Sequence, residues 1–237
     1  MTIDICLSPA LLSYYAQPND VVVVTDIFRA TTTMCMAFSN GAKSIIPVAS
    51  IEEAEEYKQN GYLVGAERNT KRCTFADFGN SPFEYTENRV KNKEIVFTTT
   101  NGTLALHAAK ESGKVLIGAF SNIEAVVEKS IELGERIVVL CAGWNNKVNM
   151  EDLLFAGAFA ERLSAHTSLN LDSDAAKIAL DLWNIAKENV ADYLKGTDHY
   201  HRLVANGLEK DIQFCLQQNT LPLVPFYDKR EAKIRVR

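Results

Sequence analysis

The sequence predicts an α/β protein with a layered, largely parallel sheet covered by helices. Up to about residue 142, short apolar runs alternate with amphipathic segments of helical period. The continuous run Val21–Val24 is typical of a strand that is buried on both faces. Residues 150 to about 218 are almost entirely helical in pattern, so we expect a C-terminal helical part that closes over the sheet.

The individual elements follow from these patterns and from the glycines, prolines and capping residues at their ends. Three helices are expected at 30–39, 51–60 and 122–133, and each is followed by a glycine that can end it. Ser121 and Glu124 fit a capping box for the third helix. Prolines limit a short last strand within 221–226. The expected strands are 21–25, 44–48, 62–66, 94–99, 115–119 and 136–142.

Composition bounds the class of protein. The 237 residues, with 47% hydrophobic content, predict one large domain or two closely joined lobes over 1–237. A net charge of −5 argues against nucleic acid and anionic membranes as partners. Without a signal-like or membrane-spanning run we expect a cytoplasmic protein. The five cysteines form no CxxC pair, which argues against a disulfide framework or a zinc cluster, and a homo-oligomer is left open.

The segment Thr98–Thr103 carries the strongest chemical signal. It follows an expected strand and precedes an expected helix, where free backbone N–H groups and the helix dipole favour anions. Gly102 allows a ligand to approach the backbone closely. One interpretation is a phosphate cradle, and the other is ordinary capping by Asn101 or Thr100. The candidate phosphate-binding residues here are Thr99, Thr100, Asn101, Gly102 and Thr103.

A second turn of the same design follows the valine run. Asp26 lies near the carboxyl end of that strand, where open α/β sheets place their ligands. Arg29, Thr31 and Thr32 then open the next helix.

Two more turns carry polar residues at strand ends. Because the carboxyl ends of parallel strands share one edge, all four turns together describe an anion site lined with carboxylates. Helix capping is the alternative for Ser81, and a favourable helix dipole is the alternative for Glu151. The candidates in these turns are Glu67, Asn80, Ser81, Cys141, Gly143, Glu151 and Asp152.

Carboxylates beside a phosphate cradle would repel a phosphoester unless a cation lies between them. Mg²⁺ typically uses one or two carboxylates, waters and substrate oxygens. The sequence therefore predicts a magnesium-dependent phosphatase or phosphotransferase. The candidate metal ligands are Asp26, Glu67, Glu151 and Asp152.

Several of these motifs, in this order, resemble the 2-phosphosulfolactate phosphatases. They are Asp26–Thr33, Gly65–Arg68, Phe78–Glu84, Thr98–Thr103, Cys141–Gly143, Glu151–Asp152 and Ala156–Ala158, with a weaker stretch from His199 through Asp211 to Pro225. The resemblance implies a Mg²⁺-dependent hydrolase that converts a small anionic phosphoester, 2-phosphosulfolactate, to sulfolactate and phosphate in coenzyme M biosynthesis. A second acid group on such a substrate needs a basic partner, and the nearby candidates are Arg29, Arg68, Lys71 and Arg72. Tyr200 follows His199 where glycine is expected, so His199 is either a site residue or a packing histidine at a helix start.

The expected mechanism is in-line attack of an activated water on phosphorus. Asp26 would hold the metal or activate the water, and Arg29 and Asn101 would stabilise charge on the phosphoryl oxygens. A nucleophilic Cys141 is an alternative route, although Lys147 stands where cysteine-dependent phosphatases need arginine. Other open functions are a phosphatase of a related ester such as phospholactate, a non-catalytic phosphoester-binding protein, and a nucleotide phosphotransferase, for which no glycine-rich nucleotide loop is found.

Overall fold

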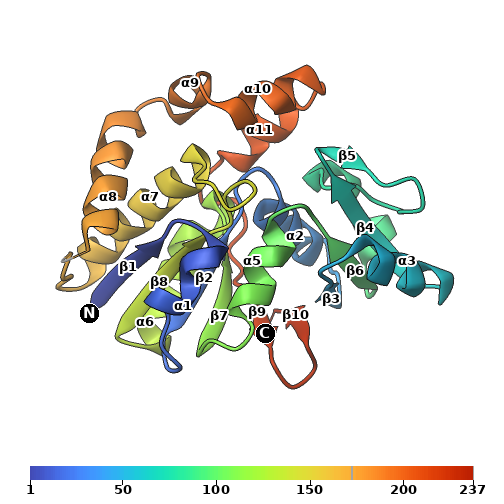
Figure 1. Ribbon diagram of the computed structural model, residues 1–237, viewed down its shortest axis with the longest axis horizontal. Helices are drawn as coiled ribbons and strands as arrows, with labels where there is room; N and C mark the ends of the chain where they lie inside the picture. Colours follow the sequence, from blue (N-terminus) through green and yellow to red (C-terminus); the bar gives the residue numbers. More distant parts are fainter. Residues whose placement is uncertain (172, 237) are drawn as a thin grey trace.

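A mixed sheet forms the centre of the molecule in the computed structural model, which describes residues 1–171 and 173–236 (Figure 1). Within these residues it has ten strands in the order β1-β8-β2-β7-β9-β10-β3-β6-β4-β5. The strands are β1 (Thr2–Cys6), β2 (Val21–Thr25), β3 (Ser44–Pro47), β4 (Leu63–Arg68), β5 (Lys71–Arg72), β6 (Glu94–Thr98), β7 (Lys114–Gly118), β8 (Arg136–Cys141), β9 (Phe226–Asp228) and β10 (Lys233–Arg235).

The sheet contains two parallel blocks. Strands β1, β8, β2 and β7 pair in parallel, and so do β3, β6 and β4. The C-terminal hairpin β9–β10 joins the blocks through antiparallel contacts to β7 and β3. The prediction of a largely parallel sheet is therefore confirmed, and the division into one domain or two lobes stays a prediction.

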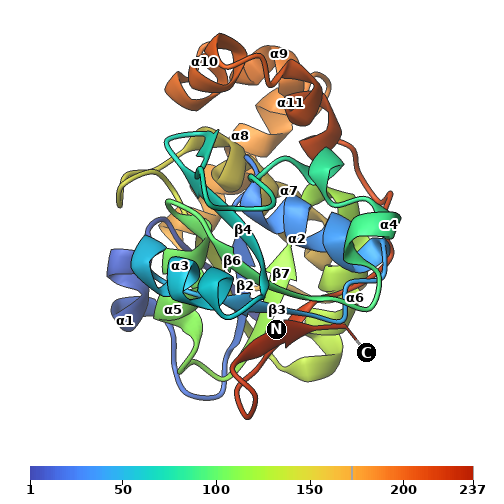
Figure 2. The same cartoon turned by 90° about the vertical axis from the view of Figure 1, so that its right-hand side faces the viewer.

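Strand β2 shows why the valine run becomes a central strand. All five of its residues are buried, with Val22 paired to Val138 of β8 on one side and Val115 of β7 on the other. A β-branched run of this kind packs well when both faces of a strand are covered. Figure 2 shows the cover, with α1, α3 and α5 on one face of the sheet and α2, α4 and α6 on the other.

The helices begin and end close to the expected positions. Gly41 and Gly61 follow α2 and α3 with φ of +83° each, the left-handed conformation that glycine adopts without strain. The α-helices are α1 (Leu12–Tyr15), α2 (Ala30–Ser39), α3 (Ile51–Gln59), α4 (Glu87–Val90), α5 (Gly102–Ala109), α6 (Ile123–Leu133), α7 (Met150–His166), α8 (Asp174–Ala186), α9 (Val190–Leu194), α10 (Asp198–Ala205) and α11 (Glu209–Cys215). Three 3-10 turns cover Pro9–Leu11, Pro82–Glu84 and Phe120–Asn122.

The capping box predicted from Ser121 and Glu124 is wrong. The 3-10 turn Phe120–Asn122 precedes α6, and the helix starts without a side-chain cap. Asn122 accepts a hydrogen bond from the Ala119 N–H instead, and the Glu124 N–H donates to the Asn219 side chain. The extra turn moves the helix start beyond Ser121. The acceptor for the Glu124 N–H is Asn219, which lies near the other end of the chain.

The last strand also differs from the expectation. Residues 221–225 form no strand, and β9 begins at Phe226 and pairs with β10. Pro222 and Pro225 lack the N–H groups that a ladder needs, so pairing begins only after them. Strands β1, β5 and β10 have no counterpart in the sequence prediction, because β5 and β10 have only two and three residues and β1 is a short run at the start of the chain.

Helices α9, α10 and α11 lie over the edge of the sheet at which the parallel strands end (Figures 1 and 2). We call residues 190–215 the cap. Gly196 lies between α9 and α10, and Gly207 lies between α10 and α11. The predicted helical part that closes over the sheet is therefore present, and it covers the edge to which the site was assigned.

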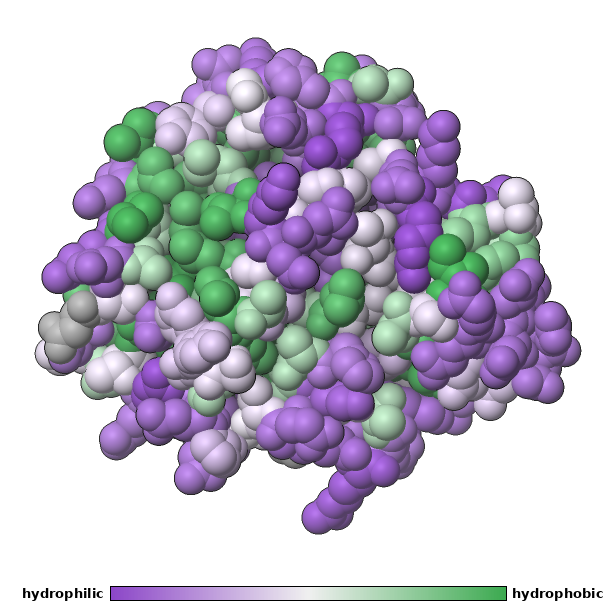
Figure 3. Space-filling model, viewed as in Figure 1, coloured by the Kyte–Doolittle hydropathy of each residue, from purple (hydrophilic) through white to green (hydrophobic). Residues whose placement is uncertain are grey.

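Two surface properties complete the description. No helix in the described part of the chain is long and apolar enough to cross a membrane. Figure 3 shows an apolar area over α7 and α8, and α8 exposes 53% of Ile178 and 68% of Ile185. A homo-oligomer stays open, as it is in the sequence.

Candidate active site

A small cavity lies beneath the cap, at the carboxyl ends of the parallel strands. Its volume is about 10 Å³, which is room for about one water molecule. The turns after β2, β4, β6 and β8 all contribute to it, as does helix α10 of the cap. Its lining residues are Asp26, Phe28, Arg29, Glu67, Thr70, Asn80, Thr99, Asn101, Trp144 and His199.

Asp26 lies where the N-termini of two helices meet. Its Oδ1 accepts a hydrogen bond of 3.4 Å from the Ala30 N–H at the start of α2. A Cβ at Gly102, the first residue of α5, would lie 2.8 Å from Asp26 Oδ2. Burial raises the pKa of Asp26 from 3.8 to about 6, opposed by the nearby His199 and aided by Glu67. The carboxyl group therefore lies beside two helix N-termini, which favour an anion, but its burial destabilises the ionised form.

Glu67 reaches the same cavity from the end of β4. It is 5% exposed, and its Oε1 accepts hydrogen bonds from the Thr70 N–H and, at 3.4 Å, from the Thr100 hydroxyl. The loop after β4 and the turn after β6 thus fix this carboxylate. Asp26 and Glu67 are brought together from the two different parallel blocks of the sheet.

The turn before α5 is built around Gly102. A Cβ there would lie 2.6 Å from the Ala30 side chain, so only glycine lets α5 approach α2 this closely. Asn101 does not cap the helix with its side chain; its Oδ1 accepts from the Asn145 N–H at 3.1 Å. Thr103 and Thr99 bond to one another across the first turn, with Thr103 Oγ1 donating to Thr99 O at 3.0 Å. Capping by the Asn101 side chain is thereby ruled out, and the cradle remains a prediction.

Arg29 is ion-paired across the cavity wall. Its Nη1 donates to Asp211 Oδ2 at 2.7 Å, and the two side chains are 3% and 6% exposed. Ser81 donates its hydroxyl to the other oxygen of Asp211 at 3.1 Å, and a Ser81 side-chain cap of the following turn is absent. Asn80 lines the cavity, and its Oδ1 is buried without a hydrogen-bond partner in the described part of the chain.

The two acidic residues at the start of α7 have separate roles, and neither lines the cavity. Asp152 accepts from the Ile27 N–H at 2.8 Å and the Gly143 N–H at 3.1 Å, so it ties the turn after β2 to the turn after β8. Burial raises the pKa of Asp152 well above its ordinary range, and Asp26 and Glu151 add to this. Glu151 is fully buried and contacts His199. Both carboxylates therefore have protein partners where the sequence suggested a metal.

Several predicted substrate-binding residues instead hold the turns in shape. Thr31 donates to Asp26 O at 3.0 Å, and Thr32 donates to Ile27 O at 3.3 Å. Arg68 donates to Glu67 O at 2.7 Å and to Thr98 Oγ1 at 3.0 Å, outside the cavity lining. These groups position the site residues and do not face the cavity.

Cys141 ends β8 as a buried residue beside the site. Burial raises the pKa of its thiol well above the ordinary value, and the Asp152 carboxylate adds to this effect. The thiol therefore stays protonated and is a poor nucleophile. Gly143 follows with φ of +64°, which the turn toward α7 requires.

Sequence reasoning missed Phe28, Thr70 and Trp144 as cavity residues, and it left His199 open between a site residue and a packing histidine. Phe28 and Trp144 contact the His199 ring, with centroid distances of 5.9 Å and 5.6 Å. Thr70 belongs to the loop that binds Glu67. The signal for His199 lay in the weaker part of the family resemblance, and no local pattern distinguishes it from a packing histidine.

Comparisons with known proteins agree with this geometry. The family model described as 2-phosphosulpholactate phosphatase matches residues 6–230. A probable 2-phosphosulfolactate phosphatase of Clostridium beijerinckii is 34% identical over 240 residues, covering 99% of each chain. Proteins of the same name from Caldanaerobacter subterraneus and Thermotoga maritima are each 38% identical and cover 86% of this chain and 86% and 87% of their own.

An α/β fold with this family match defines a hydrolase of the phosphoric monoester class. More narrowly, the chain belongs to the 2-phosphosulfolactate phosphatase family.

Proposed function

We propose that the protein hydrolyses 2-phosphosulfolactate to sulfolactate and inorganic phosphate with the help of Mg²⁺. The observation that carries the proposal is the convergence of Asp26, Glu67, Asn80 and Asn101 on one cavity at the carboxyl ends of the strands. The names of the relatives supply the substrate.

The charges around the cavity favour a divalent cation. Among the described residues that line it, Arg29 is the one guanidinium, and its charge is already balanced by Asp211. Asp26 and Glu67 would therefore repel a phosphate dianion without a further positive charge. No group of three or more His, Cys, Asp or Glu residues in the described part of the chain forms a complete metal cage. Mg²⁺ needs no such cage, because it is bound through one or two carboxylates plus waters and substrate oxygens.

Asp26 and Glu67 are the two residues that we assign to the metal. Glu151 and Asp152 are left out because neither lines the cavity. Glu151 Oε1 pairs with His199, and backbone N–H groups occupy both oxygens of Asp152. When bound, Mg²⁺ supplies neutralisation of the phosphoryl oxygens, which makes phosphorus more open to attack by water.

The remaining residues bind and orient the phosphoester. The N–H groups at the start of α5 and the side chains of Asn80, Thr99 and Asn101 offer hydrogen-bond donors to the phosphoryl oxygens. Water attacks phosphorus in line with the departing ester oxygen, the new P–O bond forms, and the ester P–O bond breaks. Arg29, which is ion-paired with Asp211, lies in the cavity wall, where its guanidinium can stabilise negative charge that develops on the substrate.

Phosphate release from 2-phosphosulfolactate tests the proposal, measured beside phospholactate, phosphoglycolate and p-nitrophenyl phosphate. Each ester is assayed with Mg²⁺ and again with EDTA. Release that needs Mg²⁺ and is fastest for phosphosulfolactate supports the full assignment. A preference for phospholactate would keep the site and change the substrate, and no turnover of any ester would favour a phosphoester-binding protein.

A further inference from the structure

Glu151 and His199 form a buried pair that the proposed hydrolysis has not yet used. His199 Nδ1 lies 2.5 Å from Glu151 Oε1, although the residues are 48 positions apart in the sequence. Glu151 is 0% exposed and His199 is 7% exposed. Asn149 donates its side-chain N–H to the same Glu151 oxygen at 3.0 Å, which fixes the carboxylate from a second side.

The rest of the histidine ring faces the cavity. His199 lines the cavity and Glu151 does not, so the ring lies between the carboxylate and the space in which the substrate would react. Phe28 packs edge-on against the ring and Trp144 packs at a tilt, and they hold its plane. His199 Nε2 has no hydrogen-bond partner in the described part of the chain, and this nitrogen is not fully buried.

This arrangement fits a proton donor. A carboxylate that bonds to Nδ1 fixes the orientation of an imidazole and leaves Nε2 as the nitrogen that can donate a proton toward the cavity. The departing ester oxygen of a 2-hydroxy acid becomes a basic alkoxide unless it receives a proton as the P–O bond breaks. Among the other cavity residues, Asp26 and Glu67 are assigned to the metal as carboxylates, and arginine does not release its proton.

We propose that His199 donates a proton from Nε2 to the leaving oxygen of the phosphoester, and that Glu151 is the positioning residue that holds the protonated ring. The inference rests on the proposed phosphatase activity. As water forms its bond to phosphorus, the electron pair of the breaking P–O bond stays with the leaving oxygen. That oxygen takes the His199 proton and departs as the alcohol, and the ring is reprotonated from water.

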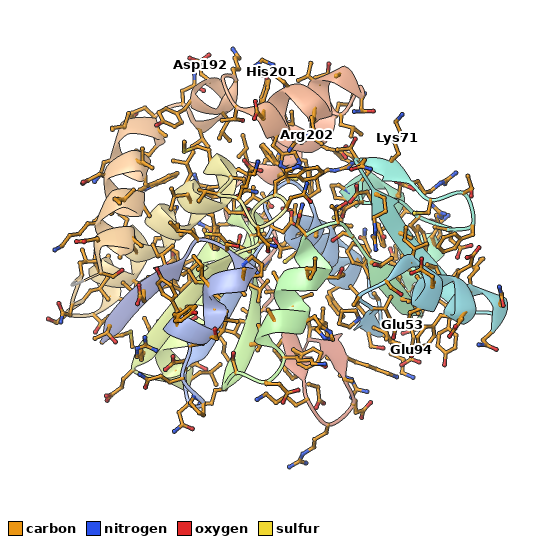
Figure 4. All side chains as sticks on the ribbon, in the orientation of Figure 1. Glu53, Lys71, Glu94, Asp192, His201 and Arg202 are labelled. Carbon is orange, nitrogen blue, oxygen red and sulfur yellow. The ribbon has the colours of Figure 1, made fainter. Side chains whose placement is uncertain are left out.

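The location of His199 on α10 gives the cap a role in the chemistry. Figure 4 shows Arg202 on the inner side of the cap and His201 on its outer side. The Arg202 guanidinium lies 4.0 Å from the centre of the Trp144 ring, so α10 is held against the turn after β8. This contact therefore helps to hold His199, on the same helix, at the cavity.

The test compares esters whose leaving groups differ in their need for a proton. His199→Asn is measured with 2-phosphosulfolactate and with p-nitrophenyl phosphate or the phosphate ester of trifluorolactate, whichever the wild-type protein hydrolyses. We expect kcat for phosphosulfolactate to fall by about 10²–10⁴-fold, the usual contribution of general acid catalysis. The loss should be much smaller for an ester with an acidic leaving group, because nitrophenolate departs without protonation and the trifluorolactate alkoxide, being less basic, needs a proton less.

Two further variants sharpen the result. Glu151→Gln keeps a hydrogen-bond acceptor but removes the charge, so we expect a smaller loss with the same leaving-group dependence, in kcat more than in KM. His201→Asn is the matched control, since His201 is exposed two residues further along α10, and it should leave kcat unchanged for both esters.

Equal losses for both kinds of ester in His199→Asn would overturn the inference and leave the phosphatase assignment intact. If the wild-type protein hydrolyses no ester, both proposals fail together. If His199→Asn does not fold, the inference is tested with the wild-type protein alone, by comparing its rates on esters with different leaving groups. A rate that hardly changes with leaving-group acidity supports proton donation, and a steep dependence contradicts it.

Discussion

Arg29 and Asp211 are 182 positions apart in the sequence, yet Arg29 Nη1 donates to Asp211 Oδ2 at 2.7 Å in the wall of the cavity. Arg29 precedes α2 at the end of β2, and Asp211 lies in α11 of the cap. The buried pair thus fastens the cap to the sheet and at the same time reduces the positive charge that Arg29 offers to a substrate. A cavity of about 10 Å³ is too small for phosphosulfolactate, so some of the residues that line it must move to admit the substrate.

Removing Asp211 should destabilise the protein and loosen the cap. Asp211→Ala leaves the buried Arg29 without its partner, which costs about 3–5 kcal/mol in comparable buried pairs. Urea unfolding measures the loss. Asp192→Ala is the control, because Asp192 forms an exposed ion pair with Lys195 in α9 and should leave the unfolding midpoint unchanged. Equal midpoints for the two variants would show that the Arg29 pair does not hold the cap.

Glu67→Gln should weaken the response to Mg²⁺. The substitution removes one of the two carboxylate charges that we assign to the metal, while an amide oxygen remains. We expect the Mg²⁺ concentration for half-maximal activity to rise on the order of 10–100-fold. A Mg²⁺ titration of phosphate release measures this, with Glu53→Gln on the exposed side of α3 as the control. An unchanged midpoint would remove Glu67 from the metal site.

Asp26 should make the metal-free protein less stable as the pH rises. Its pKa is raised from 3.8 to about 6 in the folded state, so between these values the folded state binds more protons than the unfolded state. The free energy of unfolding then falls with increasing pH, by an amount on the order of 3 kcal/mol for this group alone.

Comparison with Asp26→Asn isolates that contribution. In EDTA, the variant should be more stable than the wild-type protein at pH 7.5, and the difference should shrink toward pH 4. The variant should also lose phosphatase activity and any stabilisation by Mg²⁺. Asp181→Asn, an exposed site on α8, serves as the control. A difference that does not change with pH would mean that Asp26 titrates normally.

Gly102→Ala should disturb the start of α5. The new Cβ would meet the Ala30 side chain at 2.6 Å and Asp26 Oδ2 at 2.8 Å, so the helix must move away from the cavity. We expect a loss of about 1–3 kcal/mol in stability and weaker inhibition by inorganic phosphate. Gly196→Ala is the matched control, because its Cβ would meet nothing within 4 Å. If inorganic phosphate inhibits Gly102→Ala as strongly as it inhibits the wild-type protein, the phosphate cradle is contradicted.

Cys141→Ala should retain phosphatase activity. The thiol is buried and its pKa is raised well above the ordinary value, so little thiolate forms near neutral pH. A steady-state assay with 2-phosphosulfolactate measures the variant, and a thiol-directed reagent should leave the wild-type rate unchanged. Loss of turnover in a folded Cys141→Ala protein would support the alternative mechanism in which Cys141 is the nucleophile.

The sequence by itself determined the largely parallel core of the sheet and the edge at which the candidate site lies. Local patterns sufficed for this, because the Val21–Val24 run requires burial on both faces and polar residues after parallel strands must share one edge. That reasoning placed Asp26, Glu67 and Asn101 at the same cavity. The metal, the substrate and the role of each carboxylate stay predictions.

The tertiary structure decided which of the candidate side chains face the cavity and which support it. Glu151 and Asp152 are neighbours with the same charge, and only the arrival of His199 and of the Ile27 and Gly143 N–H groups separates their roles. Those partners come from distant parts of the chain, as Asp211 does for Arg29. Periodicity and capping report contacts within a few residues, whereas a buried charge takes its partner from whichever element packs against it.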